Sequence, residues 1–331
     1  MKRFRIIALI LSLLMLMTIT IGCTEKKESD NELKVEDIEQ VEDIDQLEDE
    51  AVENKNFPVE VQDKFGNTEI IEEEPMTIIS LAPSNTETLF ALGLGDRVVG
   101  VTPFCDYPEE AQTKEKVGDY SGNNLERIIE LEPDLILVYG PGDEEENRIL
   151  REAGIKVLGF LSETMDDIMK DIETIGKATG RNEKAADIIN SIKEKRDSVV
   201  QQVKGAEKVT VFYEIWHDPL MGAGKGSFLD ELISLAGGEN IAYDTDGPYP
   251  QYDLEQLIER DPQVYLASKD SDDKTIESIK TRPGYEAISA IKYDRIYLFE
   301  ANEANLISRP GPRIGEALEV IAKALHPELF E

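Results

Sequence analysis

The chain has 331 residues, of which 69 are acidic and 35 are basic, so its formal net charge is −34 at pH 7. This excess of negative charge excludes a nucleic-acid-binding protein, which needs a basic surface opposite the phosphates, and it argues against direct binding to anionic lipid headgroups. Two cysteines and two histidines supply neither a disulfide framework nor the several ligands of a typical zinc or manganese carrier.

The first 22 residues have the features of a bacterial signal peptide. Three basic residues in the segment MKRFR precede the apolar run Ile6–Ile21, which is somewhat shorter than the roughly 20 residues of a membrane-spanning helix. The run stops at Gly22-Cys23, which resembles a lipobox, although Thr20 stands where that motif usually has Leu. We therefore expect Cys23 to be acylated and to anchor the chain at the extracytoplasmic face of the cell membrane. The alternative is an ordinary secretory signal with an incidental cysteine.

Residues 23–56 have a different composition from the rest of the chain. They are crowded with Asp and Glu and contain no aromatic residue. Such a segment cannot bury enough apolar surface to offset the entropy lost on ordering. The composition therefore predicts a disordered, self-repelling tether between the lipid anchor and a folded body.

The body of the chain contains an internal repeat. Leu125–Leu137 (LERIIELEPDLIL) and Leu254–Leu266 (LEQLIERDPQVYL) both open with Leu-Glu and place an acidic residue before a proline. Each pattern predicts a short helix, a proline turn and a buried strand. The flanking segments also correspond, and each is expected to contain a strand: Ile78–Gly100 and Val209–Ile241 before the two copies, Ile155–Phe160 and Arg295–Phe299 after them.

This repeat predicts an α/β fold with two similar lobes and largely parallel sheets. Between the lobes, Asn182–Gly205 carries apolar residues at helical spacing, which predicts one long connecting helix. The expected apolar positions are Ala186, Ile189, Ile192, Val199 and Val203. The predicted boundaries are 57–181 for the first lobe, 182–206 for the connecting helix and 207–331 for the second lobe. A single helix between lobes implies a stiff hinge and a small closure around a ligand held in the cleft.

One long string is specific enough to indicate a family. Pro75–Leu137 resembles the substrate-binding proteins of ABC importers for vitamin B12, haem and ferric siderophores, and the first lobe is most similar to the vitamin B12-binding branch. The resemblance continues through Gly237–Ile241 (GGENI) to Ser308–Ile314 (SRPGPRI). It implies two Rossmann-like lobes bridged by one helix, a monomeric carrier rather than an enzyme, and delivery of a ligand to a permease dimer with a cytoplasmic ATPase.

Two glutamates occupy equivalent positions in the repeat. The resemblance implies that Glu126 and Glu255 dock into arginine-lined pockets of the permease. A second interpretation is that each carboxylate complements a helix N-terminus, because Asn124 and Asp253 are suitable N-caps and place the glutamates at the second helical position. The two roles are compatible.

Aromatic residues follow several predicted strands, where the ligand-facing side chains of open α/β sheets are found. Stacking and apolar area can hold a large flat ligand such as a corrinoid. By resemblance, Phe104, Tyr120, Tyr139 and Tyr249 line the cleft, while the single tryptophan, Trp216, lies at a shifted position. Arg309, in a Pro-Gly-rich loop, is a further candidate for polar groups of the ligand. Any one of these aromatic residues could instead be a half-buried packing residue, and Arg309 a solvated one.

The sequence suggests less specific roles for four other residues. His217 is either an axial ligand of haem iron or cobalt or a polar loop residue, and His326 is expected at the surface. Ser84–Glu87 (SNTE) has the form of a capping box, with a structural role for Glu87. Cys105 is expected to be small and buried.

The expected ligand is a corrinoid, with haem or a ferric siderophore as the alternative. No catalytic set and no resident cofactor are indicated. A ligand sensor or an enzyme on the same scaffold remains the alternative from another class.

Overall fold

The computed structural model describes residues 56–119 and 122–330. Cys23, Tyr120 and almost all of the predicted tether therefore lie outside the described residues. Asn54–Glu331 forms one compact unit, and the account below is of this unit. Within residues 56–119 and 122–330, no helix is both long enough and apolar enough to cross a membrane.

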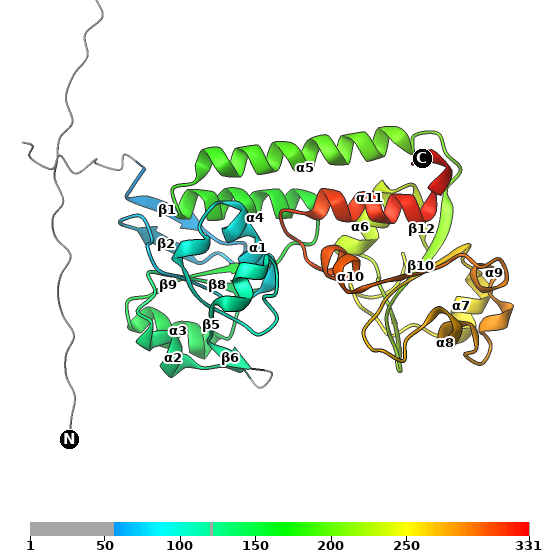
Figure 1. Ribbon diagram of the computed structural model, residues 1–331, viewed down its shortest axis with the longest axis horizontal. Helices are drawn as coiled ribbons and strands as arrows, with labels where there is room; N and C mark the ends of the chain where they lie inside the picture. The colour runs from blue at the N-terminus through cyan, green and yellow to red at the C-terminus, as the bar shows by residue number, and fades with distance from the viewer. Residues whose placement is uncertain (1–55, 120–121, 331) are drawn as a thin grey trace, which may run out of the picture. The chain divides into compact units, whose positions relative to one another are not determined.

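The first lobe is built on a five-stranded parallel sheet in the order β5-β4-β3-β8-β9. A separate antiparallel hairpin, β1–β2, lies near β9, and β6 pairs with β7 (Figure 1). The strands are β1 Val59–Gln62, β2 Thr68–Ile71, β3 Ile78–Ser80, β4 Val98–Val101, β5 Glu115–Lys116, β6 Gly118–Asp119, β7 Gly122–Asn123, β8 Leu135–Tyr139 and β9 Lys156–Phe160. The helices are α1 Pro83–Ala91, α2 Leu125–Glu130, α3 Glu144–Glu152 and α4 Met165–Ala178, with short 3-10 turns at Gly95–Arg97 and Glu109–Thr113.

The second lobe has a related sheet in the order β11-β10-β13-β14, and β12 also pairs with β10. The β10–β13, β13–β14 and β10–β12 pairs are parallel, whereas β11 returns antiparallel to β10. The strands are β10 Val209–His217, β11 Leu220–Gly222, β12 Gly238–Asn240, β13 Val264–Ser268 and β14 Ile296–Phe299. The helices are α6 Phe228–Leu235, α7 Leu254–Arg260, α8 Ile276–Lys280, α9 Ser289–Lys292, α10 Ala301–Ser308 and α11 Ile314–Leu325. These two sheets confirm the predicted fold class.

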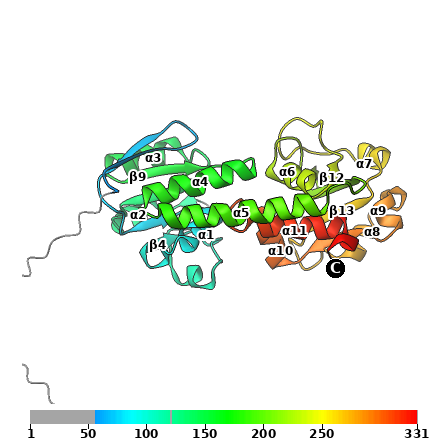
Figure 2. The same ribbon diagram turned by 90° about the horizontal axis from the view of Figure 1, so that it is seen from above.

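The connecting helix α5 spans Asn182–Gln202 and packs against both α4 and α11. These two helices follow one another along the length of α5 (Figure 1 and Figure 2). Its fully buried residues are Ala185, Ile192 and Val199. They are spaced by seven residues, so they form a single stripe along the helix. The expectation for Ala186 is wrong, because Ala186 lies one position away from this stripe and is exposed.

The two helices reach α5 closely because small residues lie at the crossings. A Cβ at Gly176 of α4 would lie 2.5 Å from the Cβ of Ala185, and one at Gly315 of α11 would lie 3.0 Å from Lys195. The same apolar cluster runs from Ile78 in the first sheet, through these helices, to Val211 in the second. The lobes therefore share a core across the connecting helix, which is the physical basis for a stiff hinge.

The repeat is confirmed as a helix, a turn and a strand in both lobes: α2 leads to β8, and α7 leads to β13. Ile128 and Leu257 occupy the same position in the two copies and are both fully buried. Glu132 and Asp261 precede the prolines and both adopt left-handed backbone conformations, with φ of 46° and 42°. Non-glycine residues rarely adopt this conformation, so the shared backbone outlier supports structural equivalence of the copies.

Each turn is fastened to the preceding strand in the same way. The backbone N–H of Asp134 donates to the Thr77 hydroxyl, and that of Gln263 donates to the Thr210 hydroxyl, both over 3.1 Å. In return, the Asp134 and Gln263 side chains accept hydrogen bonds from the backbone N–H groups of Thr77 and Thr210. This match fixes α2 and α7 at corresponding places in their lobes.

The second lobe buries one carboxylate completely. Glu214 of β10 is fully buried and forms ion pairs with Lys274, at 2.8 Å, and with Arg282. It also accepts a hydrogen bond from the Tyr265 hydroxyl. Burial alone would raise the pKa of Glu214, but hydrogen bonds from Arg282, Lys274 and Tyr265 hold it below its usual value. The cluster ties the segment before and after α8 to the central strand of the sheet.

Replacing Glu214 should destabilise the fold strongly. In Glu214→Ala, Lys274 and Arg282 would lose their buried counter-charge, and we expect the free energy of unfolding at pH 7 to fall by about 3–5 kcal/mol. Urea unfolding measures this loss, with Glu194→Ala, an exposed position on α5, as the control. A change in Glu214→Ala no larger than that of the control would contradict the structural role of the cluster.

Candidate ligand-binding site

Four of the predicted aromatic side chains lie at the carboxyl ends of strands or in the loops that follow them. Phe104 follows β4, Tyr139 ends β8, Trp216 is near the end of β10, and Tyr249 follows β12. Their exposed fractions are 48%, 57%, 46% and 39% respectively. Large aromatic surfaces at this edge of an open α/β sheet are typical of ligand contacts. Tyr120 was expected beside them, but it lies outside the described residues.

Tyr139 and Tyr249 come from different lobes, and Tyr139 lies near enough to affect the pKa of Tyr249. Burial raises the pKa of Tyr249 to about 12, and the nearby Tyr139 hydroxyl contributes in the same direction. Burial also raises the pKa of Tyr213, which lies behind Tyr249 on β10, to about 12. The phenols of Tyr213 and Tyr249 are therefore neutral at physiological pH, and they offer aromatic faces and hydroxyl groups rather than charge.

The two histidines have different environments. His217 ends β10 and is exposed, with its ring centroid 6.3 Å from that of Trp216. The expectation for His326 is wrong: this residue is 3% exposed, and its Nε2 lies 3.2 Å from the carbonyl oxygen of Gly237. The turn Pro327–Leu329 after α11 folds back, so the histidine packs inward. Within the described parts of the chain, no three His, Cys, Asp or Glu side chains are grouped to hold a metal ion.

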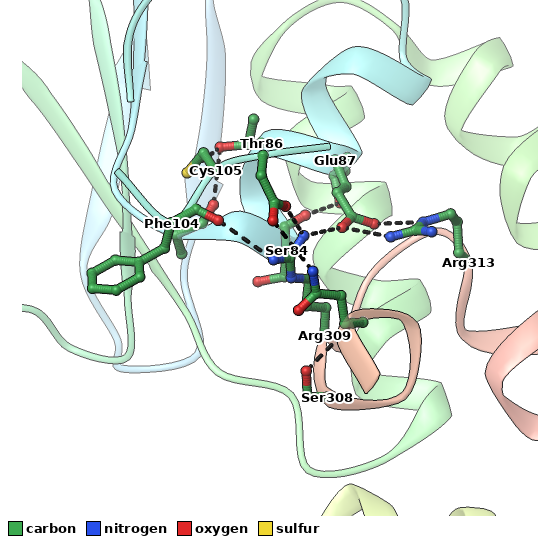
Figure 3. Close-up of polar contacts among 12 residues, drawn as sticks. Ser84, Thr86, Glu87, Phe104, Cys105, Ser308, Arg309 and Arg313 are labelled. Carbon is green, nitrogen blue, oxygen red and sulfur yellow. Dashed lines mark hydrogen bonds and ion pairs between the residues drawn. The ribbon is translucent and has the colours of Figure 1, made fainter. Parts of the chain in front are cut away.

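Arg309 does lie near the aromatic residues, but its guanidinium already has carboxylate partners. Its Nη1 lies 2.6 Å from Asp106 Oδ1 and 3.2 Å from Glu87 Oε1 (Figure 3). Arg313 adds two hydrogen bonds of 2.8 Å to the Glu87 carboxylate. The expected structural role of Glu87 agrees with this arrangement, but the capping box at Ser84 is wrong. Helix α1 begins at Pro83 with Ala82 as its N-cap, and no side chain caps it.

Cys105 is 1% exposed, as expected, and its thiol lies 3.1 Å from the Thr86 hydroxyl. Sequence reasoning missed the contacts of Asp106 and Arg313. The spacing of Arg309 and Arg313 in the segment SRPGPRI was the one available signal for a pair of cations acting together.

A small cavity of about 10 Å³ lies beside Tyr139, with room for roughly one water molecule. Asp171 of α4 lines it, together with Ser162, whose hydroxyl donates to Asp171 Oδ2 over 2.7 Å. Burial raises the pKa of Asp171 to about 6, although the Ser162 hydrogen bond opposes this shift. The cavity also touches Pro310, so it lies where the two lobes meet.

The raised pKa of Asp171 predicts a pH-dependent stability. A folded-state pKa above the unfolded value means that the charged form destabilises the fold above about pH 6, and that this cost disappears as the pH falls below about 4. Asp171→Asn should therefore increase the free energy of unfolding by about 1–3 kcal/mol at pH 8 and have little effect at pH 4. Urea unfolding across this range tests it, with the exposed Asp187→Asn as the control. An equal effect of Asp171→Asn at both pH values would contradict the assignment.

Glu126 and Glu255 are exposed second residues of α2 and α7. The helix ends are capped by their neighbours, as predicted. The Asn124 side chain accepts from the N–H of Arg127, and the Asp253 side chain accepts from those of Glu255 and Gln256. Among residues 56–119 and 122–330, neither glutamate carboxylate has an ion-pair or hydrogen-bond partner. Both remain available for a contact outside the chain.

Comparison with known proteins identifies the family. The family model described as periplasmic binding protein matches residues 78–303. The chain belongs to the periplasmic binding protein family. This membership and the two-lobed fold confirm the resemblance drawn from the sequence motifs.

Two similar proteins and one similar solved structure show the extent of the likeness. An uncharacterised ABC transporter substrate-binding lipoprotein, YvrC of Bacillus subtilis, is 34% identical over 83% of this chain and 88% of its own length. The vitamin B12-binding protein of Vibrio cholerae is 30% identical over 75% of this chain and 88% of its own. A solved structure of a possible iron-binding (periplasmic solute-binding) protein from Staphylococcus epidermidis is 30% identical, has a TM-score of 0.67, and aligns over 77% of this chain and 100% of its own.

Proposed function

We propose that this periplasmic binding protein is a lipid-anchored carrier that captures a corrinoid of the vitamin B12 type and delivers it to an ABC permease. The observation that carries the proposal is the set of exposed aromatic side chains that both lobes present at the carboxyl ends of their strands. The name and similarity of the Vibrio cholerae relative support the choice of ligand. The lipoprotein name of the Bacillus subtilis relative, with the lipobox-like Gly22-Cys23, supports an anchor at Cys23 on the extracytoplasmic side.

The chemistry of the aromatic set suits a large, flat chelate. Phe104, Tyr139, Trp216 and Tyr249 offer ring faces, while Arg309, which lies beside Phe104, is already paired with Asp106 and Glu87. A ligand held mainly by stacking and apolar contact needs few charges from the protein. This favours a corrinoid over a small charged solute such as an amino acid.

Haem or a ferric siderophore is the second candidate for the same site. Two observations favour it: the tyrosines of opposite lobes, Tyr139 and Tyr249, which interact, and the exposed His217 beside Trp216. Phenolate oxygen and imidazole nitrogen are both known axial ligands of haem iron. The relatives are named for ligand binding. A ligand sensor is a further alternative, because it would have the same binding site as a transport protein.

Titration of the soluble body, residues 57–331, distinguishes these ligands. We expect cyanocobalamin to bind with one-to-one stoichiometry by calorimetry and to quench the fluorescence of Trp216, the single tryptophan. Hemin and a ferric siderophore serve as parallel ligands. Binding of hemin with a shifted Soret band, without binding of cyanocobalamin, would contradict the corrinoid proposal and favour His217 or a tyrosine as an iron ligand.

We further propose that Glu126 and Glu255 are the contacts with the permease dimer. They occupy identical positions in the repeat, one in each lobe, and the conserved geometry of the two turns holds them in corresponding places. Exposed carboxylates without intramolecular partners within the described residues are suited to pairing with arginines of another protein.

The double variant Glu126→Ala, Glu255→Ala should abolish uptake of the transported ligand while changing its affinity for the soluble body less than about twofold, because neither residue contacts the proposed ligand site. Uptake is measured in cells with the full-length chain and its permease. The matched control is Glu130→Ala with Glu259→Ala, which changes the equivalent exposed glutamates near the other ends of the same helices. Equal loss of ligand affinity in the first variant would contradict a docking role.

A further inference from the structure

We propose that Arg309 is a positioning residue, which acts on the ligand through Phe104 by clasping the loop 102–108 of the first lobe from the second. The clasp is the set of Glu87, Asp106, Asn305, Arg309 and Arg313. This inference goes beyond the proposed function in assigning how the site is held, and it rests on that function only for the choice of ligand used to test it. It replaces the expectation that Arg309 contacts the ligand directly.

The clasp has a buried half. Glu87 of α1 is 3% exposed, and its carboxylate receives a bidentate pair of hydrogen bonds from Arg313 at the start of α11. The Arg313 guanidinium also lies over the ring of Tyr107, 3.7 Å from its centroid. A buried carboxylate paired in this way is a fixed attachment, because separating the ions would leave an uncompensated charge in the interior.

The second half of the clasp is more accessible and reaches the loop that carries Phe104. Arg309 donates to Asp106 Oδ1 over 2.6 Å and to the backbone carbonyl oxygen of Phe104 over 3.4 Å (Figure 3). Asn305 of α10 donates to the other oxygen of Asp106 over 3.2 Å. The Asp106 side chain keeps 45% of its surface exposed, against 2% for Glu87. Both oxygens of the Asp106 carboxylate thus accept hydrogen bonds from the second lobe, although the side chain is not buried.

The two halves of the clasp connect different parts of the protein. Glu87 and Arg313 join α1 to α11 next to the connecting helix and contribute to the stable hinge. Asp106, Asn305 and Arg309 instead hold the loop that carries the exposed side chain of the proposed ligand contact Phe104. Cys105, which belongs to the same loop, is buried, and its thiol lies beside the Thr86 and Thr102 hydroxyls. The loop is therefore held to the interior of its own lobe by Cys105 and to the second lobe by Arg309.

Fixing the loop in the absence of ligand would reduce the entropy lost when Phe104 stacks on the ligand, which is the usual gain from preorganisation. It would also make the position of Phe104 depend on the position of the second lobe, because Asn305 and Arg309 belong to α10 and the segment after it. The ligand would therefore meet aromatic side chains whose spacing is set across the lobes before binding.

A double-mutant cycle tests the clasp. Asp106→Ala removes the hydrogen bonds that Arg309 and Asn305 donate to the Asp106 carboxylate. It leaves the buried pair of Glu87 and Arg313 intact, so the variant is expected to fold. With cyanocobalamin as the ligand, Asp106→Ala alone should weaken binding to the soluble body by about 10-fold. In a Phe104→Ala background the same substitution should have almost no further effect. Glu109→Ala, an exposed acid in the same region, is the matched control and should leave the affinity unchanged.

Unchanged affinity in Asp106→Ala, or losses that multiply in the double variant, would overturn the proposal, because the clasp would not act through Phe104. If the wild-type body binds hemin rather than cyanocobalamin, the corrinoid proposal fails and the same cycle is run with hemin. Hydrogen exchange of the ligand-free protein gives a readout independent of any ligand. Amides of residues 104–107 should exchange faster in Asp106→Ala and not in Glu109→Ala, and equal exchange in both variants would also overturn the clasp.

Discussion

The packing of the connecting helix is the constraint on which the rest of the structure depends. The stripe of Ala185, Ile192 and Val199 is buried between α4 and α11, and small residues at Gly176 and Gly315 let the helices approach closely. Because the apolar cluster is continuous through these helices, moving one lobe far from the other would expose core surface. A close-packed interior resists such deformation, which favours the small lobe closure expected from a single connecting helix.

Two buried carboxylates add ion pairs to this apolar core. Glu87 and Glu214 are each enclosed and each held by two cations, but they act at different levels. Glu214 joins parts of the second lobe to each other, whereas Glu87 joins the first lobe to the segment that begins α11. An ion pair of this kind contributes little net stability compared with apolar packing, but its disruption is costly. The arrangement therefore selects one relative position of α1 and α11 among those that apolar packing alone would permit.

The repeat connects this architecture to the proposed interaction with a permease. In both lobes the same sequence of helix, left-handed turn and strand is fixed by a threonine hydroxyl and by an N-cap, and in both it leaves an exposed glutamate at the second helical position. A carrier that must present two acidic contacts to a dimeric partner needs them at related positions on a rigid body. The shared core across α5 provides the rigidity, and the repeat provides the related positions.

Local sequence patterns predicted several helices and strands and the exposure of residues at strand ends. The apolar periodicity, the proline turns and the paired N-caps predicted the helix, turn and strand of both repeat copies, because these signals act over a few residues. Phe104, Tyr139, Trp216 and Tyr249, which were expected near strand ends, are exposed there, because the end of a strand can be located from local pattern. The tertiary structure alone decided the pairing of Arg309 with Asp106 and Glu87 and the burial of His326 and of Glu214. The contacts of Arg309 join residues up to 222 positions apart, and no local pattern records which distant partner will neutralise a charge.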